Sequence, residues 1–140
     1  IKLVAESFGH QIVFPAHPRT VKRLKDFKLA SFISSIKKLN IIEPLSYLDF
    51  LMLLSESRLV LTDSGGIQEE SCVLKVPCVT LRENTERPET IKVGANYVAG
   101  IKPGSILTGV KTMLKKKGEW ENPLGENASQ KIVDIIEDKL

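Results

Sequence analysis

The chain has 140 residues, of which 42% are hydrophobic and 26% charged, a composition typical of one globular domain with a buried core. Its net charge of +3 is too small to indicate a nucleic-acid partner, and no apolar run approaches the roughly 20 residues that span a bilayer. Since no signal peptide is visible, we expect a cytoplasmic protein in which Cys72 and Cys78 are buried thiols; neither a metal nor a cofactor is indicated.

Helical segments alternate with short apolar strands along the chain. In the first half, the patterns predict a helix at 1–8 closed by Gly9, a strand at 11–14, a partly helical stretch at 18–39 broken near Leu29, a strand at 40–42, and a helix capped by Ser46 that runs to Ser55. In the second half, they predict strands at 58–61, 77–81 and 96–99, and helices at 65–75, from Pro88, at 105–117 up to Gly118, and at 126–140.

This alternation predicts an α/β fold with a doubly wound, Rossmann-like parallel sheet in a single domain over 1–140. The strands are continuous apolar runs, which is typical of a sheet covered on both faces. Ligands of such sheets bind beyond the carboxyl ends of the strands. We therefore expect one functional edge, formed by His17 and the segments 43–47, 63–66 and 82–87.

The segment Asp63-Ser64-Gly65-Gly66 joins an apolar strand to a helix. Its backbone N–H groups and the helix dipole favour an anion, and adjacent glycines let a ligand approach the backbone closely. Each glycine weakens the helix by about 1 kcal/mol unless something needs the space. The pattern therefore predicts a diphosphate site on Ser64, Gly65 and Gly66, although it matches neither a dinucleotide fingerprint nor a P-loop. An ordinary capped helix is the alternative.

Two charged residues extend this candidate site. Glu70 lies four residues after Gly66 on the same helix face, so its carboxylate is placed to accept hydrogen bonds from a ribose diol. Arg87 precedes Pro88 at a second helix start, where it can neutralise a phosphate. The alternative for Glu70 is a glutamate that only contacts solvent, which is what we expect of Glu69. The alternative for Arg87 is a surface arginine paired with Glu86 or Glu89.

His17 and Phe50 have two interpretations each. His17 follows a strand and is either a cleft residue that contacts a ligand or a structural histidine bonded to a nearby carbonyl. Phe50 lies in the helix after the 43–48 turn, where periodicity alone favours core packing.

Four strings together carry a family resemblance that runs in order from about residue 10 to 100: His17-Pro18-Arg19-Thr20, the turn 43–48, the run 61–70, and Thr85-Glu86-Arg87-Pro88-Glu89. They closely resemble the non-hydrolysing UDP-N-acetylglucosamine 2-epimerases. The resemblance implies the C-terminal, UDP-binding half of a two-domain GT-B fold. It implies that the nucleotide is bound by seven residues: Ser64, Gly65 and Gly66 at the diphosphate, Glu70 at the ribose, Arg87 near the nucleotide sugar, and Leu45 and Phe50 at the uracil.

The family reaction converts UDP-N-acetylglucosamine to UDP-N-acetylmannosamine by elimination and re-addition of UDP. By resemblance, the carboxylates that act at C2 of the sugar belong to an N-terminal domain that these residues do not include. We therefore expect UDP or UDP-N-acetylglucosamine as the ligand, no turnover by the 140 residues alone, and a homodimer in the full-length enzyme. The resemblance also implies that the first strand of the domain is absent, so the strands at 11–15 and 58–62 either leave a gap or pair directly.

Three other functions remain open from the sequence. A GT-B glycosyltransferase uses the same architecture and would transfer the sugar to an acceptor. A non-catalytic UDP-sugar-binding module would lack the upstream carboxylates. A hydrolysing epimerase would release UDP and free N-acetylmannosamine.

Overall fold

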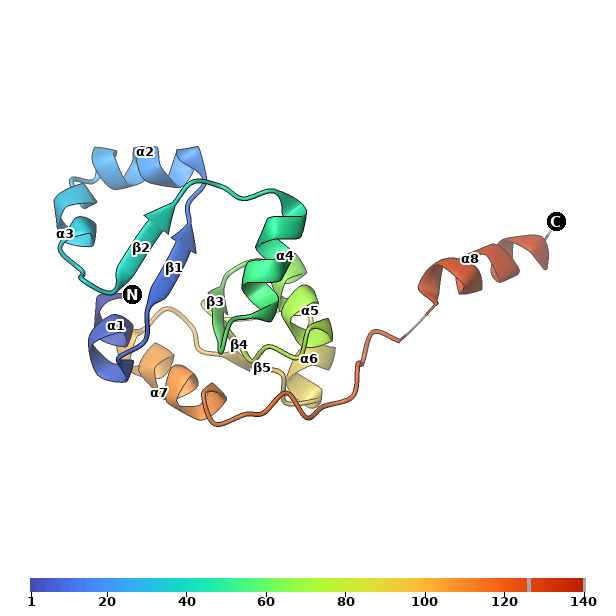
Figure 1. Ribbon diagram of the computed structural model, residues 1–140. Coiled ribbons are helices and arrows are strands. Elements are labelled where there is room, and N and C mark those ends of the chain that lie inside the picture. Colours follow the sequence, from blue (N-terminus) through green and yellow to red (C-terminus); the bar gives the residue numbers. More distant parts are fainter. Residues whose placement is uncertain (126, 140) are drawn as a thin grey trace.

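The computed structural model describes residues 1–125 and 127–139. Helices and strands alternate along the chain (Figure 1), in the order α1 (Lys2–Phe8), β1 (Ile12–Pro15), α2 (Pro18–Asp26), α3 (Ala30–Ser34), β2 (Leu39–Ile42), α4 (Tyr47–Ser55), β3 (Val60–Thr62), α5 (Gly65–Val73), β4 (Cys78–Thr80), α6 (Pro88–Lys92), β5 (Asn96–Val98), α7 (Pro103–Met113) and α8 (Ala128–Glu137). The predicted α/β class and the order of its elements are confirmed.

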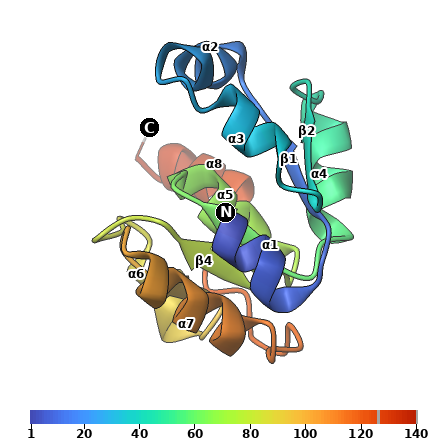
Figure 2. The same cartoon turned by 90° about the vertical axis from the view of Figure 1, so that its left-hand side faces the viewer.

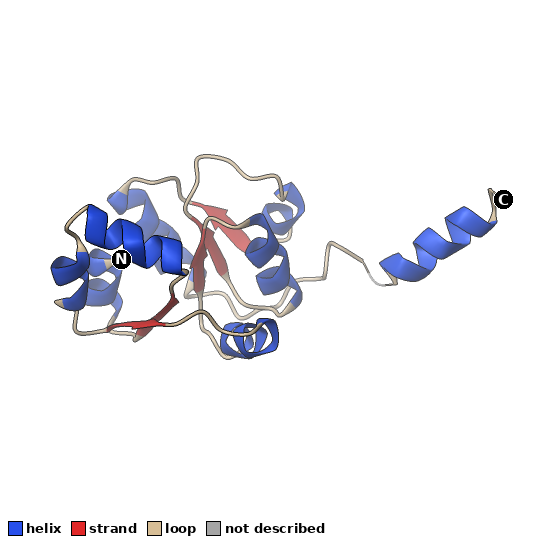
Figure 3. Cartoon of the chain, turned by 90° about the horizontal axis from the view of Figure 1, so that it is seen from above, coloured by secondary structure: helices blue, strands red, loops and turns tan. Residues whose placement is uncertain are grey.

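The strands form two parallel sheets (Figure 3). β1 pairs with β2, with Ile12 opposite Leu39, and β3, β4 and β5 pair in that order, with Leu61 opposite Val79. Within the described residues, no ladder joins β1 to β3. Of the two expected arrangements the structure has the gap, and the expected single sheet is divided there.

The three-stranded sheet is covered on both faces, as a doubly wound fold requires. Figure 2 shows β4 between α5 and α7. Because side chains alternate across a strand, Val79 packs into the core beneath α1 and α7, whereas Cys78 and Thr80 face the α5 side. The two-stranded sheet is less covered, since Val13 and Ile41 are each 40% exposed. Coverage of both faces is therefore confirmed for β4 and wrong for β1 and β2.

Local signals explain where most helices start and end. The Ser46 hydroxyl accepts a hydrogen bond from the backbone N–H of Asp49 at 3.3 Å and caps α4, as predicted. Pro88 occupies the first turn of α6, and the predicted break near Leu29 separates α2 from α3. The predicted helix up to Gly118 is too long, because α7 ends at Met113 and the backbone bond from Lys116 to Met113 already belongs to a turn.

The last helix, α8, projects away from the rest of the molecule (Figures 1 and 3). It is shorter than the predicted 126–140, and residues 126 and 140 lie outside the described residues. Its apolar residues Ile132, Val133, Ile135 and Ile136 are exposed. Among the helices of the described part of the chain, none has the length and apolar character to cross a membrane.

Both cysteines are buried free thiols, and we expect Cys78 to make the stability sensitive to alkaline pH. Burial raises the pKa of the Cys78 thiol from its ordinary 9.0 to about 11, which outweighs the hydrogen bonds to Ser71 and Thr80. The unfolded thiol loses its proton first, so we expect the free energy of unfolding to fall as pH rises from 9 to 11, by about 2 kcal/mol for this group. Urea unfolding across this range would measure the fall.

Cys78→Ala is the matched control, because it removes the titrating thiol and leaves every other ionisable group in place. We expect the alkaline fall to be shallower in this variant than in the wild-type chain. Equal slopes in the two proteins would contradict the assignment to Cys78.

Candidate functional site

The turn between β3 and α5 has the geometry of a helix start left open to a ligand. The backbone N–H of Ser64 donates to the Thr62 hydroxyl at 3.1 Å, which fixes the turn directly after the strand. Ser64 is the predicted N-cap residue, with extended backbone angles, and α5 begins at Gly65. In the described part of the chain, the Ser64 side chain makes no capping bond to the helix, so its hydroxyl remains available to a ligand.

Neither glycine of the turn is required by the protein's own packing. A Cβ added to Gly65 would lie 3.9 Å from Cζ and Nη2 of Arg87, and one added to Gly66 would lie 3.9 Å from the Ser64 hydroxyl. Both distances are ordinary van der Waals contacts, and neither glycine has a positive φ. Because no packing contact and no backbone angle requires glycine here, the bare backbone leaves space in which a ligand could approach it closely.

Arg87 lies beside this turn, as predicted, but its ion-pair partner differs from the expected ones. Its Nε is 2.6 Å from Oε1 of Glu69, and both side chains are 35% exposed. The Nε–H is not aimed at the oxygen, so the contact is an ion pair without a hydrogen bond. Glu69 is therefore more than the solvated glutamate expected from the sequence.

Glu86 is engaged elsewhere. Its carboxylate accepts two hydrogen bonds from Arg82, at 3.0 and 2.9 Å, and these bonds lower the pKa of the exposed Glu86 carboxyl. The hydrogen bond between Arg87 and Glu86 runs from Nη1 to the backbone carbonyl, at 3.1 Å. The alternative pairing of Arg87 with the Glu86 carboxylate is wrong, because Arg82 holds that carboxylate.

A buried polar network behind the turn was missed by the sequence analysis. The amide oxygen of Gln68 accepts hydrogen bonds from the Thr85 hydroxyl and from Nδ2 of Asn96, the latter at 3.0 Å. Asn96 also donates to the Thr90 hydroxyl and accepts from the Thr80 hydroxyl. The only sequence signal was the presence of amide and hydroxyl side chains in segments otherwise expected to be buried.

The other predicted residues lie farther from this group. α5 contains both Gly66 and Glu70, so Glu70 shares the face of Gly66, as predicted. Phe50 is half-buried on α4, which packs against α5, and Leu45 is 36% exposed in the turn before α4. Among the described residues, no hydrogen bond or ion pair joins Leu45, Phe50 or His17 to the glycine turn.

His17 has a local structural role. It is exposed, and its Nδ1 accepts a hydrogen bond from the backbone N–H of Arg19 at 3.2 Å, which caps α2. The structural interpretation of His17 is thus closer to what is observed, although the partner is an N–H group and not a carbonyl.

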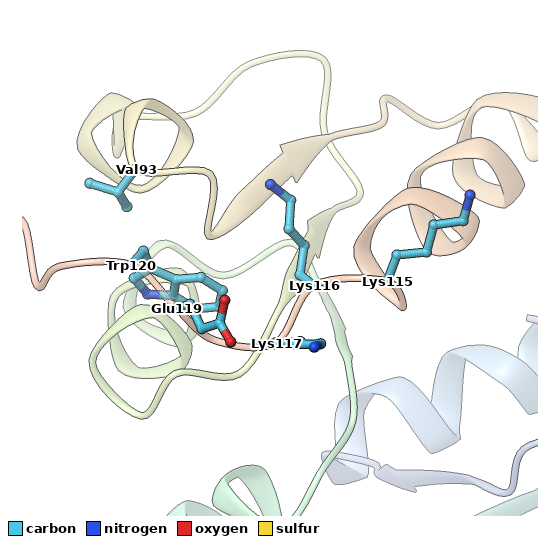
Figure 4. A pocket seen from close by; sticks show the side chains of 6 residues that line it. All are labelled: Val93, Lys115, Lys116, Lys117, Glu119 and Trp120. Carbon is cyan, nitrogen blue, oxygen red and sulfur yellow. The ribbon is translucent and has the colours of Figure 1, made fainter.

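A pocket of about 300 Å³ lies elsewhere and is lined by Val93, Lys115, Lys116, Lys117, Glu119 and Trp120 (Figure 4). Trp120 donates from Nε1 to the carbonyl of Cys72 near the end of α5, and Val93 directly follows α6. This pocket therefore adjoins the ends of α5 and α6 that lie opposite the glycine turn. The lysine side chains point in different directions, which does not suit a common anion.

The described residues contain no group of three or more histidine, cysteine, aspartate or glutamate side chains placed to hold a metal ion. The chemical capacity of the site therefore lies in its N–H groups, one hydroxyl, one guanidinium and nearby carboxylates. Such a set binds and stabilises an anion with attached hydroxyl groups.

A sequence profile of the family described as UDP-N-acetylglucosamine 2-epimerase matches residues 1–137. The chain belongs to this family. It is 52% identical over 134 residues to the UDP-N-acetylglucosamine 2-epimerase of Methanocaldococcus jannaschii, which covers 95% of the chain and 37% of that protein. It is 49% identical to the enzyme of the same name from Methanococcus maripaludis, again over 95% of the chain and over 36% of that protein.

Solved epimerase structures have the same fold. The Methanocaldococcus jannaschii UDP-GlcNAc 2-epimerase in complex with UDP-GlcNAc and UDP superposes with a TM-score of 0.90 at 52% identity, over 96% of this chain and 37% of that one. The Neisseria meningitidis epimerase bound to UDP-GlcNAc gives 0.83 at 32% identity, over 97% and 38%. This chain thus spans little more than a third of the length of the epimerases it matches.

Proposed function

We propose that residues 1–140 form the nucleotide-sugar-binding domain of an enzyme that interconverts UDP-N-acetylglucosamine and UDP-N-acetylmannosamine. The observation that carries the proposal is the bare backbone of Gly65 and Gly66 with the Arg87 guanidinium beside it. Family membership and the UDP and UDP-GlcNAc present in related epimerase structures support this choice of ligand.

In this proposal, different residues bind the diphosphate, the ribose and the uracil of the nucleotide. The N–H groups of Gly65 and Gly66 and the Ser64 hydroxyl hold the diphosphate, and Arg87 neutralises it. Glu70 accepts hydrogen bonds from the ribose hydroxyls. Phe50 and the backbone of Leu45 contact the uracil, and His17 faces the same cleft.

The mechanistic role of this domain follows from where charge develops. Elimination of UDP from the sugar places negative charge on the departing diphosphate. N–H groups fixed at the start of α5, together with one guanidinium, stabilise that charge without reorganising. The proton chemistry at C2 is assigned to groups outside these residues. We therefore expect no epimerisation by the 140-residue chain alone; measurable turnover by it would contradict this division of labour.

Calorimetric titration with UDP tests the site. We expect the wild-type chain to bind UDP, and Arg87→Ala and Glu70→Ala each to weaken binding by about 10- to 100-fold, because each removes hydrogen bonds that involve a charged group. Arg58→Ala is the matched control, because Arg58 is an exposed arginine that precedes β3, at the opposite end of the strand from the glycine turn. Unchanged UDP affinity in a variant that lacks both Glu70 and Arg87 would overturn the proposal.

Assembly and location are part of the same proposal. We propose a homodimer for the full-length enzyme and a cytoplasmic location, in which the product serves polysaccharide biosynthesis. Sedimentation of the full-length protein would measure the first of these directly.

A further inference from the structure

We infer that the buried Gln68–Asn96 network is a positioning device that fixes Arg87 against the glycine turn, with Thr85 as the link that can be tested. This inference rests on the proposed function, because it concerns how the same site holds the nucleotide diphosphate. It assigns a role to residues that need not touch the ligand.

The backbone of Arg87 is held on both sides by threonine hydroxyls. Its N–H donates to the Thr85 hydroxyl at 3.0 Å, and its carbonyl accepts from the Thr90 hydroxyl at 2.7 Å. Both hydroxyls connect to the same buried amides, Thr85 through Gln68 and Thr90 through Asn96. Two of these bonds reach the main chain of Arg87 and two fix the threonines that make them, while the backbone N–H of Thr90 also donates to the Arg87 carbonyl at 3.1 Å.

Most of this network is buried. Gln68 and Thr90 are 0% exposed and Asn96 is 4% exposed, so water cannot replace a lost partner. A buried acceptor that loses its partner bears the desolvation cost in full, which favours the arrangement in which the Gln68 oxygen keeps both its donors; Nε2 of Gln68 is buried with no hydrogen bond among the described residues. Gln68 belongs to α5, the helix that begins with the two glycines. The glycine turn and Arg87 are therefore fixed to the same helix.

The side chain of Arg87 is directed by a second contact from that helix. Glu69, the neighbour of Gln68 on α5, approaches the guanidinium at Nε, and Nη2 lies 3.9 Å from the position of a Cβ on Gly65. Successive residues of α5 thus position the backbone and the guanidinium of the same arginine. An arginine held in advance loses less entropy when it binds a diphosphate than a mobile one does.

Thr85 offers a matched pair of variants. Thr85→Val keeps the shape of this half-buried side chain and removes the hydroxyl, whereas Thr85→Ser keeps the hydroxyl. We expect Thr85→Val to weaken UDP binding by about three- to tenfold, the equivalent of one or two hydrogen bonds, and Thr85→Ser to rescue it. Thr85→Ala is the second variant if Thr85→Val does not fold, as judged by its melting curve.

A double-mutant cycle with Arg87→Ala separates positioning from a general structural effect. If Thr85 acts through Arg87, Thr85→Val changes UDP affinity by less than about twofold once Arg87 is absent. Equal weakening with and without Arg87, or wild-type affinity in Thr85→Val, would overturn the inference.

A ligand-free measurement keeps the two proposals distinguishable. Nitrogen-15 relaxation at Arg87 Nε reports the mobility of the guanidinium, which we expect to rise in Thr85→Val and to return to the wild-type value in Thr85→Ser. An immobile Arg87 in a wild-type chain that fails to bind UDP would contradict the proposed function alone. Equal mobility of the Arg87 guanidinium in the wild-type chain and in Thr85→Val would contradict the positioning role alone.

Discussion

Alanine at Gly66 is expected to stabilise the fold and to weaken UDP binding at the same time. Gly66 is the second residue of α5, its φ is not positive, and an added Cβ would have only the Ser64 hydroxyl near it, at 3.9 Å. Replacing a helical glycine by alanine gains up to about 1 kcal/mol of stability. The same methyl group would occupy the space in which we place the diphosphate, so we expect at least about tenfold weaker UDP binding. Urea unfolding and calorimetric titration measure the two effects.

Gly104→Ala is the matched control for this prediction. Gly104 is also the second residue of a helix, α7, and a Cβ there would meet nothing within 4 Å. We expect a similar gain in stability and unchanged UDP affinity. If Gly66→Ala bound UDP as tightly as Gly104→Ala does, Gly66 would have no ligand against it and the diphosphate assignment would be wrong.

Alanine at Gly109 is expected to have the opposite effect on stability. α7 approaches the sheet so closely here that an added Cβ would lie 2.8 Å from Cδ1 of Tyr97 and 3.2 Å from Cγ1 of Val79. Val79 is 0% exposed and Gly109 is itself buried, so α7 and the strands cannot separate cheaply. Overpacking of this kind costs about 1–3 kcal/mol, which exceeds the gain in helix propensity. Urea unfolding would show the loss.

Tyr97→Leu provides the second half of this test. Removing the ring takes away the nearest clashing atoms, so Gly109→Ala should cost less in a Tyr97→Leu background than in the wild-type chain. An alanine at Gly109 that leaves the free energy of unfolding unchanged would show that the close approach of α7 has no energetic role.

Features with local causes were predictable from the sequence. Ser46 caps α4 and Pro88 opens α6 because each acts on the residues next to it. The glycine turn was recognised for the same reason, since Gly65 and Gly66 have a low helix propensity and yet stand at the start of a helix. These signals need no knowledge of what packs against the segment.

Features set by distant contacts were not predictable. Gln68 looks like a surface residue of a helix, and only its partners Thr85 and Asn96, far along the chain, make its burial possible. Glu69 pairs with Arg87 because α5 and α6 are adjacent, which the sequence does not state. Gly118 does not close α7, which ends at Met113; it has a positive φ of 74°, and a Cβ on it would lie 2.6 Å from the Lys75 carbonyl oxygen, so this glycine also serves a long-range contact.

The division of the strands into two sheets has a consequence for how the molecule loses its structure. Hydrogen-bond ladders make strands unfold together, and within the described residues no ladder links β1 and β2 to β3, β4 and β5. The strands of the β1–β2 sheet are partly exposed, and side-chain packing through α1 and Ile12 joins this half to the core around Val79, so we expect it to open at a lower free energy than β3–β5. The β3–β5 half holds α5, α6 and the buried amides, so it retains Arg87 and the glycine turn. We therefore expect the proposed diphosphate site to lie in the part of the chain that melts later.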